Sequence, residues 1–193
     1  MEINQQKPSF IRQAVIVGLI FAAILFFLEV TTGMLLIYSS PATGMMVVSL
    51  FSMAVGCLVA AFAGLFGTRM YVREFNVPMT FGDGAKIGLV TGLVVALGNT
   101  FLDLIWLVIN PGFQENVLDA SIESIEAMQI PEEQKDQMID SLYAETQDAT
   151  TASGIALNLV GLMFMFGILN TLTGMLGVRF FAKQPGEIEE EQS

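Results

Sequence analysis

The sequence predicts an all-α membrane protein in which four transmembrane helices form two tandem hairpins. Of its 193 residues 53% are hydrophobic, and only 14% are charged, against about 25% in a typical soluble domain. Four long stretches are almost free of charge, and the basic residues gather on one side of the topology that these stretches define. A net charge of −11 argues against nucleic-acid binding.

Each apolar stretch is long enough to cross a hydrocarbon core, which takes about 20 helical residues. We expect the spans at residues 11–38, 44–68, 84–109 and 150–178. The outer turn at 39–43 contains Pro41, which cannot continue the first helix. The first apolar run is longer than the roughly 7–15 residues of a signal-peptide core, and no A-x-A-like cleavage site follows it. We therefore interpret it as a retained span.

Charge predicts the orientation of the spans. All the basic residues except Lys135 lie in or within three residues of the N-terminus 1–10, the loop 69–83 or the tail 179–193. The positive-inside rule then places both termini in the cytoplasm. Four of these basic side chains are predicted to anchor the protein to anionic lipid of the inner leaflet: Arg69, Arg73, Arg179 and Lys183. The tail also carries a run of acids, from Glu187 to Glu191.

The segment 110–149 is strongly acidic and is predicted to lie outside the cytoplasm. Apolar residues fall on one helical face at Leu118, Ile122 and Ile125, and on another at 138–143. We expect two short amphipathic helices that meet near Ile130 and Pro131 and pack on the span ends or on each other. A solvated acidic surface is the simple interpretation, and a docking site for a basic partner or a divalent cation is the alternative. No EF-hand pattern is present.

An internal repeat relates the two hairpins. Gly18 precedes Glu29 by the same number of residues as Gly92 precedes Asp103. The ends of the second and fourth spans also correspond, with Gly64, Gly67 and Arg69 matching Gly174, Gly177 and Arg179. A repeat of two spans gives halves of parallel topology related by an axis along the membrane normal. Chance similarity among apolar helices is the alternative.

Glu29 and Asp103 are the sharpest candidates for chemistry, because carboxylates inside spans are costly and usually face the bundle interior. At a rise of 1.5 Å per residue both lie roughly 27 Å from the cytoplasmic end of their span, at the outer edge of the hydrocarbon. Asn99 lies one turn before Asp103 and shares its face. These residues predict either a paired proton or cation site or two interfacial acids in contact with headgroup water.

Small residues recur at four-residue spacing and predict close helix packing. The glycines are Gly56, Gly64, Gly84, Gly88 and Gly92, and Ala60 and Ala96 complete the two series. Packing within the bundle is the simple interpretation, and homodimerisation is the alternative. The chain has no histidine and one cysteine, Cys57. Catalysis by Ser–His or Cys–His pairs is therefore excluded within this chain, and we predict no metal site and no cofactor.

Four short motifs resemble a bacterial membrane family known as domain of unknown function 4199. They are Thr80–Gly88 at the start of the third span, Asn110–Phe113 at its end, Met128–Gln134 in the acidic segment, and Gly167–Leu169 in the last span. The resemblance covers about Ile11 to Lys183. It implies four spans and a location in the bacterial inner (cytoplasmic) membrane, and it supplies no catalytic residues.

The sequence favours a non-enzymatic accessory or scaffold subunit. Its partners would be the lipid bilayer and either a second copy of the chain or an unidentified membrane or periplasmic protein. The alternative is a small homodimeric transporter or channel that uses Glu29 and Asp103 as a proton or cation site. A membrane-embedded enzyme is disfavoured, because no catalytic constellation is present.

Overall fold

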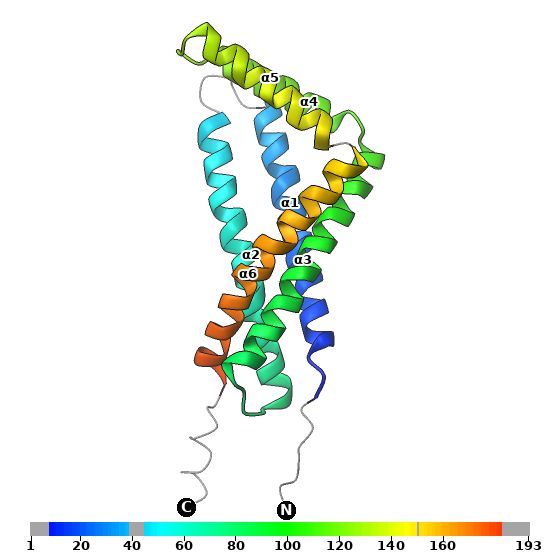
Figure 1. Cartoon of the computed structure of the whole chain (residues 1–193), viewed down its shortest axis with the longest axis vertical. Helices are drawn as coiled ribbons and strands as arrows, with labels where there is room; N and C mark the ends of the chain where they lie inside the picture. The colour runs from blue at the N-terminus through cyan, green and yellow to red at the C-terminus, as the bar shows by residue number, and fades with distance from the viewer. Residues whose placement is uncertain (1–7, 39–44, 150, 183–193) are drawn as a thin grey trace, which may run out of the picture. The chain divides into compact units, whose positions relative to one another are not determined.

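The computed structural model describes residues 8–38, 45–149 and 151–182, and this part of the chain is helical without strands (Figure 1). Its helices are α1 (Ile11–Tyr38), α2 (Met45–Phe75), α3 (Phe81–Ile109), α4 (Phe113–Glu126), α5 (Glu132–Ala149) and α6 (Ala152–Phe181). Four of them, α1, α2, α3 and α6, are long and apolar enough to cross a membrane. The predicted helical class with four candidate spans is confirmed. The expected outer turn 39–43, Lys183 and the acidic tail lie outside the described residues.

The helices extend beyond the predicted spans at the connection between α2 and α3. Most of the expected loop 69–83 is helical, because α2 continues to Phe75 and α3 begins at Phe81. Asn76 directly follows the last residue of α2, and its φ of 46° is a left-handed conformation that asparagine tolerates. The α3 helix begins with a reciprocal cap. The Thr80 backbone N–H donates to Asp83 Oδ2 over 2.9 Å, and the Asp83 N–H donates to Thr80 Oγ1 over 3.3 Å.

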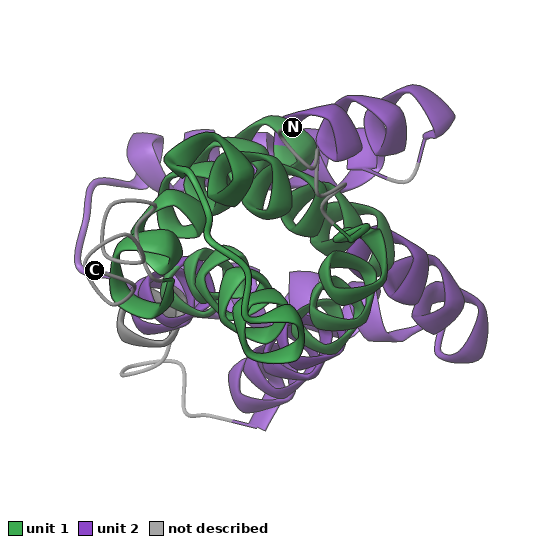
Figure 2. Ribbon diagram, turned by 90° about the horizontal axis from the view of Figure 1, so that it is seen from below, with its two compact units in different colours: residues 1–22, 58–98, 162–193 green, residues 23–57, 99–161 purple. Residues whose placement is uncertain are grey.

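The chain divides into two compact units, each of which contains a part of every long helix (Figure 2). Unit 1 comprises residues 1–22, 58–98 and 162–193, and unit 2 comprises residues 23–57 and 99–161, including α4 and α5. The two units differ in the sign of the charge they carry. Every described basic residue except Lys135 belongs to unit 1, whereas the described acids other than Glu74 and Asp83 belong to unit 2.

In unit 1, glycines bring α3 against the backbone of α6. A Cβ atom at Gly88 would meet the carbonyl oxygen of Asn170, and one at Gly92 would meet that of Phe166. Gly84 lies in the same way against Gly174, and Gly64 of α2 lies against Asn170. Four of the five predicted packing glycines therefore contact helices of their own chain. A Cβ atom at Gly56, in unit 2, would meet Leu28 at 3.9 Å and no other described residue within 4 Å.

Buried polar side chains join α2 to α6 in unit 1. The side chain of Asn170 is fully buried; its Oδ1 accepts from the Gly64 N–H, and its Nδ2 donates to the Phe166 carbonyl over 2.8 Å. The Thr68 hydroxyl donates to the Gly174 carbonyl over 3.1 Å. Such bonds between apolar helices satisfy groups that lipid cannot.

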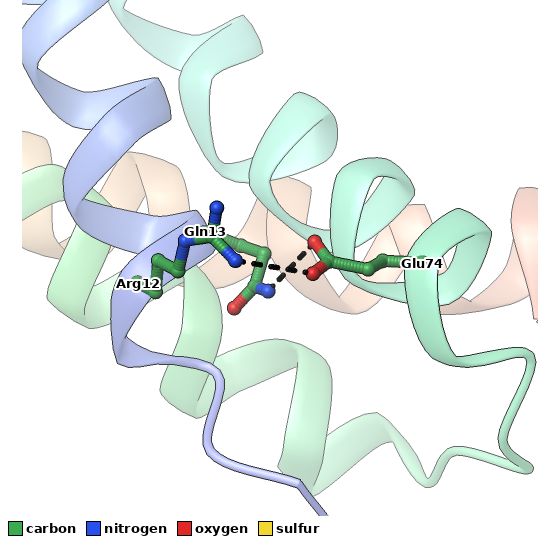
Figure 3. Close-up of polar contacts among 3 residues, drawn as sticks. All are labelled: Arg12, Gln13 and Glu74. Carbon is green, nitrogen blue, oxygen red and sulfur yellow. Dashed lines mark hydrogen bonds and ion pairs between the residues drawn. The ribbon is translucent and has the colours of Figure 1, made fainter.

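The beginning of α1 is fastened to the end of α2 in unit 1 (Figure 3). Gln13 Nε2 donates to Glu74 Oε2 over 2.8 Å, and the Arg12 guanidinium lies 3.5 Å from Glu74 Oε1. The two contacts differ in environment, because Gln13 is 1% exposed whereas the Arg12 side chain is 76% exposed. Next to them, the Tyr71 hydroxyl donates to the Pro8 carbonyl over 2.8 Å.

In unit 2, α4 and α5 pack against each other, as the apolar periodicity of the acidic segment predicts. Helix α4 buries Ser121, Ser124 and Ile125, whereas α5 buries no residue. Leu118 and Ile122, which share the predicted face with Ile125, are half-buried. On α5, Met138 is 38% and Tyr143 is 52% exposed. Ile139 and Leu142 of the same predicted face are half-buried, so the apolar face of α5 is only partly covered.

Candidate functional site

Unit 2 brings together Glu29, Asn99 and Asp103. Asn99 Nδ2 donates to both carboxylate oxygens of Glu29, over 3.3 and 3.2 Å, and to Asp103 Oδ2 over 3.1 Å. Asn99 precedes Asp103 by one turn of α3, so both side chains reach the same face, and α1 supplies Glu29 from across the interface. The sequence left open whether the two carboxyl groups meet, and the structure places them together.

The two carboxyl groups bind the same amide nitrogen, Asn99 Nδ2, so their charges lie close enough to interact. Two ionised carboxylates in one site repel each other, so the uptake of a proton or another cation relieves that repulsion. The pair is thus suited to hold one proton together with one negative charge, or to exchange that proton for another cation. Asn99 is 2% exposed, and its Nδ2 supplies donors to both acids.

A cavity of about 250 Å³ lies against this pair. Glu29 and Asp103 are both exposed and line this cavity. Residues from α1, α3, α4, α5 and α6 line the cavity, together with Asn110 between α3 and α4. Its polar lining consists of two acids, one hydroxyl and three amides: Glu29, Asp103, Thr100, Asn110, Gln114 and Asn158. None of the lining residues is basic.

Trp106 and Phe113 form an aromatic wall of this cavity. Their ring centroids lie 5.7 Å apart at an interplanar angle of 82°, and the Phe26 ring also packs edge-on against the indole, with centroids 5.9 Å apart. The Phe113 ring seats against Gly33, where an added Cβ atom would collide with it. Because Phe113 is the first residue of α4, this contact fastens the start of the acidic segment to α1.

Two buried polar atoms at this site lack a hydrogen-bond partner among the described residues. One is the indole Nε1 of Trp106, and the other is Oδ1 of Asn99. Buried donors and acceptors are rarely left unpaired, because each such group costs the free energy of its lost hydration. The first atom belongs to a side chain that lines the cavity, and the second belongs to the amide that binds the two cavity carboxyls.

The other predicted site residues lie elsewhere. Arg69, Arg73 and Arg179 are exposed in unit 1, as lipid anchors need to be. The Arg69 guanidinium lies 5.9 Å from the Phe66 ring centroid and 5.4 Å from that of Phe181, within cation–π range. Among the described residues, no three acids, cysteines or histidines gather into a metal-binding group.

Sequence reasoning missed Trp106, Phe113, Gly33 and the amides of the cavity wall. Trp106 and Phe113 are apolar residues at a span end, where aromatic side chains are common. No charge or spacing distinguishes them from membrane anchors. Asn158 is an amide within the fourth predicted span, but nothing in the sequence places it near Glu29. The only available signal was the charge-free neighbourhood of the two acids, which predicts an internal partner such as Asn99.

The profile of the family described as "Protein of unknown function (DUF4199)" matches residues 13–179. No curated protein and no solved structure matches the chain. The match covers most of the chain and includes all four candidate spans over most of their length. The chain therefore belongs to the DUF4199 family, and its apolar helices indicate a multi-pass membrane protein.

Proposed function

We propose that this member of the DUF4199 family is a non-enzymatic membrane protein that takes up a proton or a small cation at Glu29 and Asp103. The observation that carries the proposal is the shared donor: Asn99 binds both carboxyl groups beside a cavity that solutes can enter. Two interfacial acids that only contact headgroup water would have no need of a buried amide between them. The geometry thus favours the transporter or channel class over the accessory subunit that the sequence alone favours.

The repeat and the charge distribution support a fuller form of this proposal. Glu29 and Asp103 occupy corresponding positions of the two predicted hairpins, and a site between repeat halves is typical of transporters. The basic residues of unit 1 and the acidic residues of unit 2 support an orientation with both termini in the cytoplasm of a bacterial inner membrane. Four spans per chain are few for a solute path, so the proposal includes a homodimer.

Proton uptake into proteoliposomes tests this function. The protein is reconstituted with a pH-sensitive dye inside, and a potassium gradient with valinomycin drives protons inward. We expect wild-type protein to acidify the lumen faster than protein-free vesicles, and the Glu29→Gln/Asp103→Asn variant to lose this difference. The matched control is Glu126→Gln/Asp119→Asn, which makes the same two changes in unit 2 at residues outside the cavity.

The control variant should keep the wild-type rate. The same assay is repeated with an inward sodium gradient and a sodium-sensitive dye. Uptake of both ions that is equal in wild-type and Glu29→Gln/Asp103→Asn vesicles would remove the carboxyl pair from the function.

A second candidate function is that of an accessory subunit, and the exposed acidic surface of α5 favours it. This helix carries acids along its length, buries no residue and exposes Tyr143. Such a surface is suited to a basic protein partner. Purification from native membranes in mild detergent, followed by mass measurement of the intact complex, tests this candidate. A stoichiometric second protein that is lost on deletion of residues 132–148 would support it, and a bare homo-oligomer would contradict it.

A further inference from the structure

We infer that the cavity beside Glu29 and Asp103 binds a small organic cation: a primary ammonium with a neutral hydrogen-bond acceptor, such as a hydroxyl, two or three atoms away. This inference rests on the proposed function and specifies the class of ligand. It is drawn from three features of the cavity, namely its charge, its aromatic wall and its unpartnered indole donor.

The charge of the lining selects a cation. Two carboxyl groups reach the cavity, and the residues that line it include no arginine or lysine. A ligand with its own carboxylate or phosphate inside the cavity would therefore meet acids without a compensating base, which disfavours zwitterionic amino acids. The carboxylate oxygens keep free acceptor positions beyond those used by Asn99, because each carboxylate offers about four lone-pair sites. An ammonium group, which has only donors, matches these positions.

The aromatic wall favours an organic ligand. Trp106 and Phe113 present ring surface and edge to the same space as the acids, and an ammonium group near a ring is attracted by the π system. The carbon atoms of such a ligand gain burial against the rings, which a hydrated metal ion cannot do. The volume of about 250 Å³ equals that of roughly eight liquid waters. It holds a molecule of a few heavy atoms with room to spare.

The unpartnered atoms specify the rest of the ligand. The Trp106 indole N–H is buried and has no acceptor among the described residues. A ligand acceptor close to the ammonium would satisfy it while the ammonium stays at the acids. Oδ1 of Asn99 is a buried acceptor beside the same acids and suits a ligand N–H. An amino alcohol provides both complements within one small molecule.

Trp106 also provides a fluorescence signal for a binding assay, because it is the only tryptophan of the chain. The full-length protein is placed in nanodiscs of phosphatidylcholine and phosphatidylglycerol, lipids without a primary amine, and ethanolamine is titrated while the indole emission is followed. We expect a saturable change in emission. The Glu29→Gln/Asp103→Asn variant should lose it, and the control variant Glu126→Gln/Asp119→Asn should keep it. Ethylene glycol, which lacks the cation, should give no saturable change.

A calorimetric comparison tests the role of the indole. Wild-type protein should bind ethanolamine about threefold to tenfold more tightly than ethylamine, which corresponds to one net hydrogen bond. Trp106→Phe should bring the two affinities together while ethylamine binding persists. Persistence of ethylamine binding also shows that this variant is folded.

Nanodiscs that contain phosphatidylethanolamine distinguish a free amine from a lipid headgroup with the same ammonium. If the lipid supplies the ligand, the emission in these discs already equals that of the ethanolamine-saturated protein. If the ligand is a free amine, ethanolamine still shifts the emission. Absence of saturable ethanolamine binding in amine-free discs, or equal binding by the double variant, would overturn the inference. Proton or sodium uptake that persists in that case would leave the proposed function standing without this ligand.

Discussion

Glu29 on α1 and Asp103 on α3 share one amide donor, the Nδ2 of Asn99, over distances of 3.1 to 3.3 Å. This relationship joins two acids from different candidate spans at one amide, and the proposed function has them share a proton. Beside it lies the cavity walled by Trp106 and Phe113. The following predictions test the bonds of this unit, the packing that supports it and the orientation of the chain.

Removal of the shared donor should weaken the fold and uncouple the acids. Asn99→Leu should lower the free energy of unfolding by about 1 kcal/mol, the size of an interhelical hydrogen bond in membranes. The loss should shrink in the Glu29→Gln/Asp103→Asn background, where amides replace the acids. Thermal melting of the four variants in detergent, analysed as a double-mutant cycle, measures this coupling. Additive losses would show that Asn99 acts independently of the acids.

Two glycines that look alike in sequence should respond differently to the same substitution. Gly88→Ala places a methyl group on the Asn170 carbonyl, so we expect a loss of about 1 to 3 kcal/mol from overpacking. Gly56→Ala meets nothing nearer than Leu28 at 3.9 Å and should be tolerated. Unfolding in detergent compares the two variants. Equal losses would contradict the interlocked packing of α3 on α6.

In the contact between α1 and α2 that Figure 3 shows, Gln13 should contribute more to the stability of the protein than Arg12. Gln13→Ala removes a buried bond of 2.8 Å and should destabilise the protein by about 1 kcal/mol. Arg12→Ala removes an exposed ion pair of 3.5 Å and should change stability by less than about 0.5 kcal/mol. Melting temperatures at low and high salt check the order. A larger effect of Arg12→Ala would reverse this assignment.

Cysteine labelling tests the proposed orientation. In a Cys57→Ala background, Glu133→Cys on α5 should react with a membrane-impermeant maleimide on intact spheroplasts. Gly82→Cys, near the start of α3, should react only after lysis. Both positions are exposed in the structure, so access depends on the side of the membrane. The opposite pattern would invert the topology.

The spans could be predicted because apolar length alone distinguishes a membrane helix, and Glu29 and Asp103 could be identified because acids are rare in such helices. Asn99 followed from its spacing to Asp103. The helix ends near Phe75 and Phe81 could not be read from hydropathy, because caps and backbone conformation set them. Trp106, Phe113 and Gly33 were missed because their contacts join segments that are distant in the sequence, and such contacts produce no periodic pattern of residues.

Infrared difference spectroscopy on the protein in nanodiscs tests the central claim most directly, since the carbonyl stretch of a protonated carboxyl group is separate from that of a carboxylate. A proton shared by Glu29 and Asp103 predicts a protonated-carboxyl band that a rise in pH or added cation removes. The band should be missing from Glu29→Gln/Asp103→Asn and present in Glu126→Gln/Asp119→Asn. An identical spectrum of wild type and Glu29→Gln/Asp103→Asn in this region, under every condition, would contradict a shared proton at this pair.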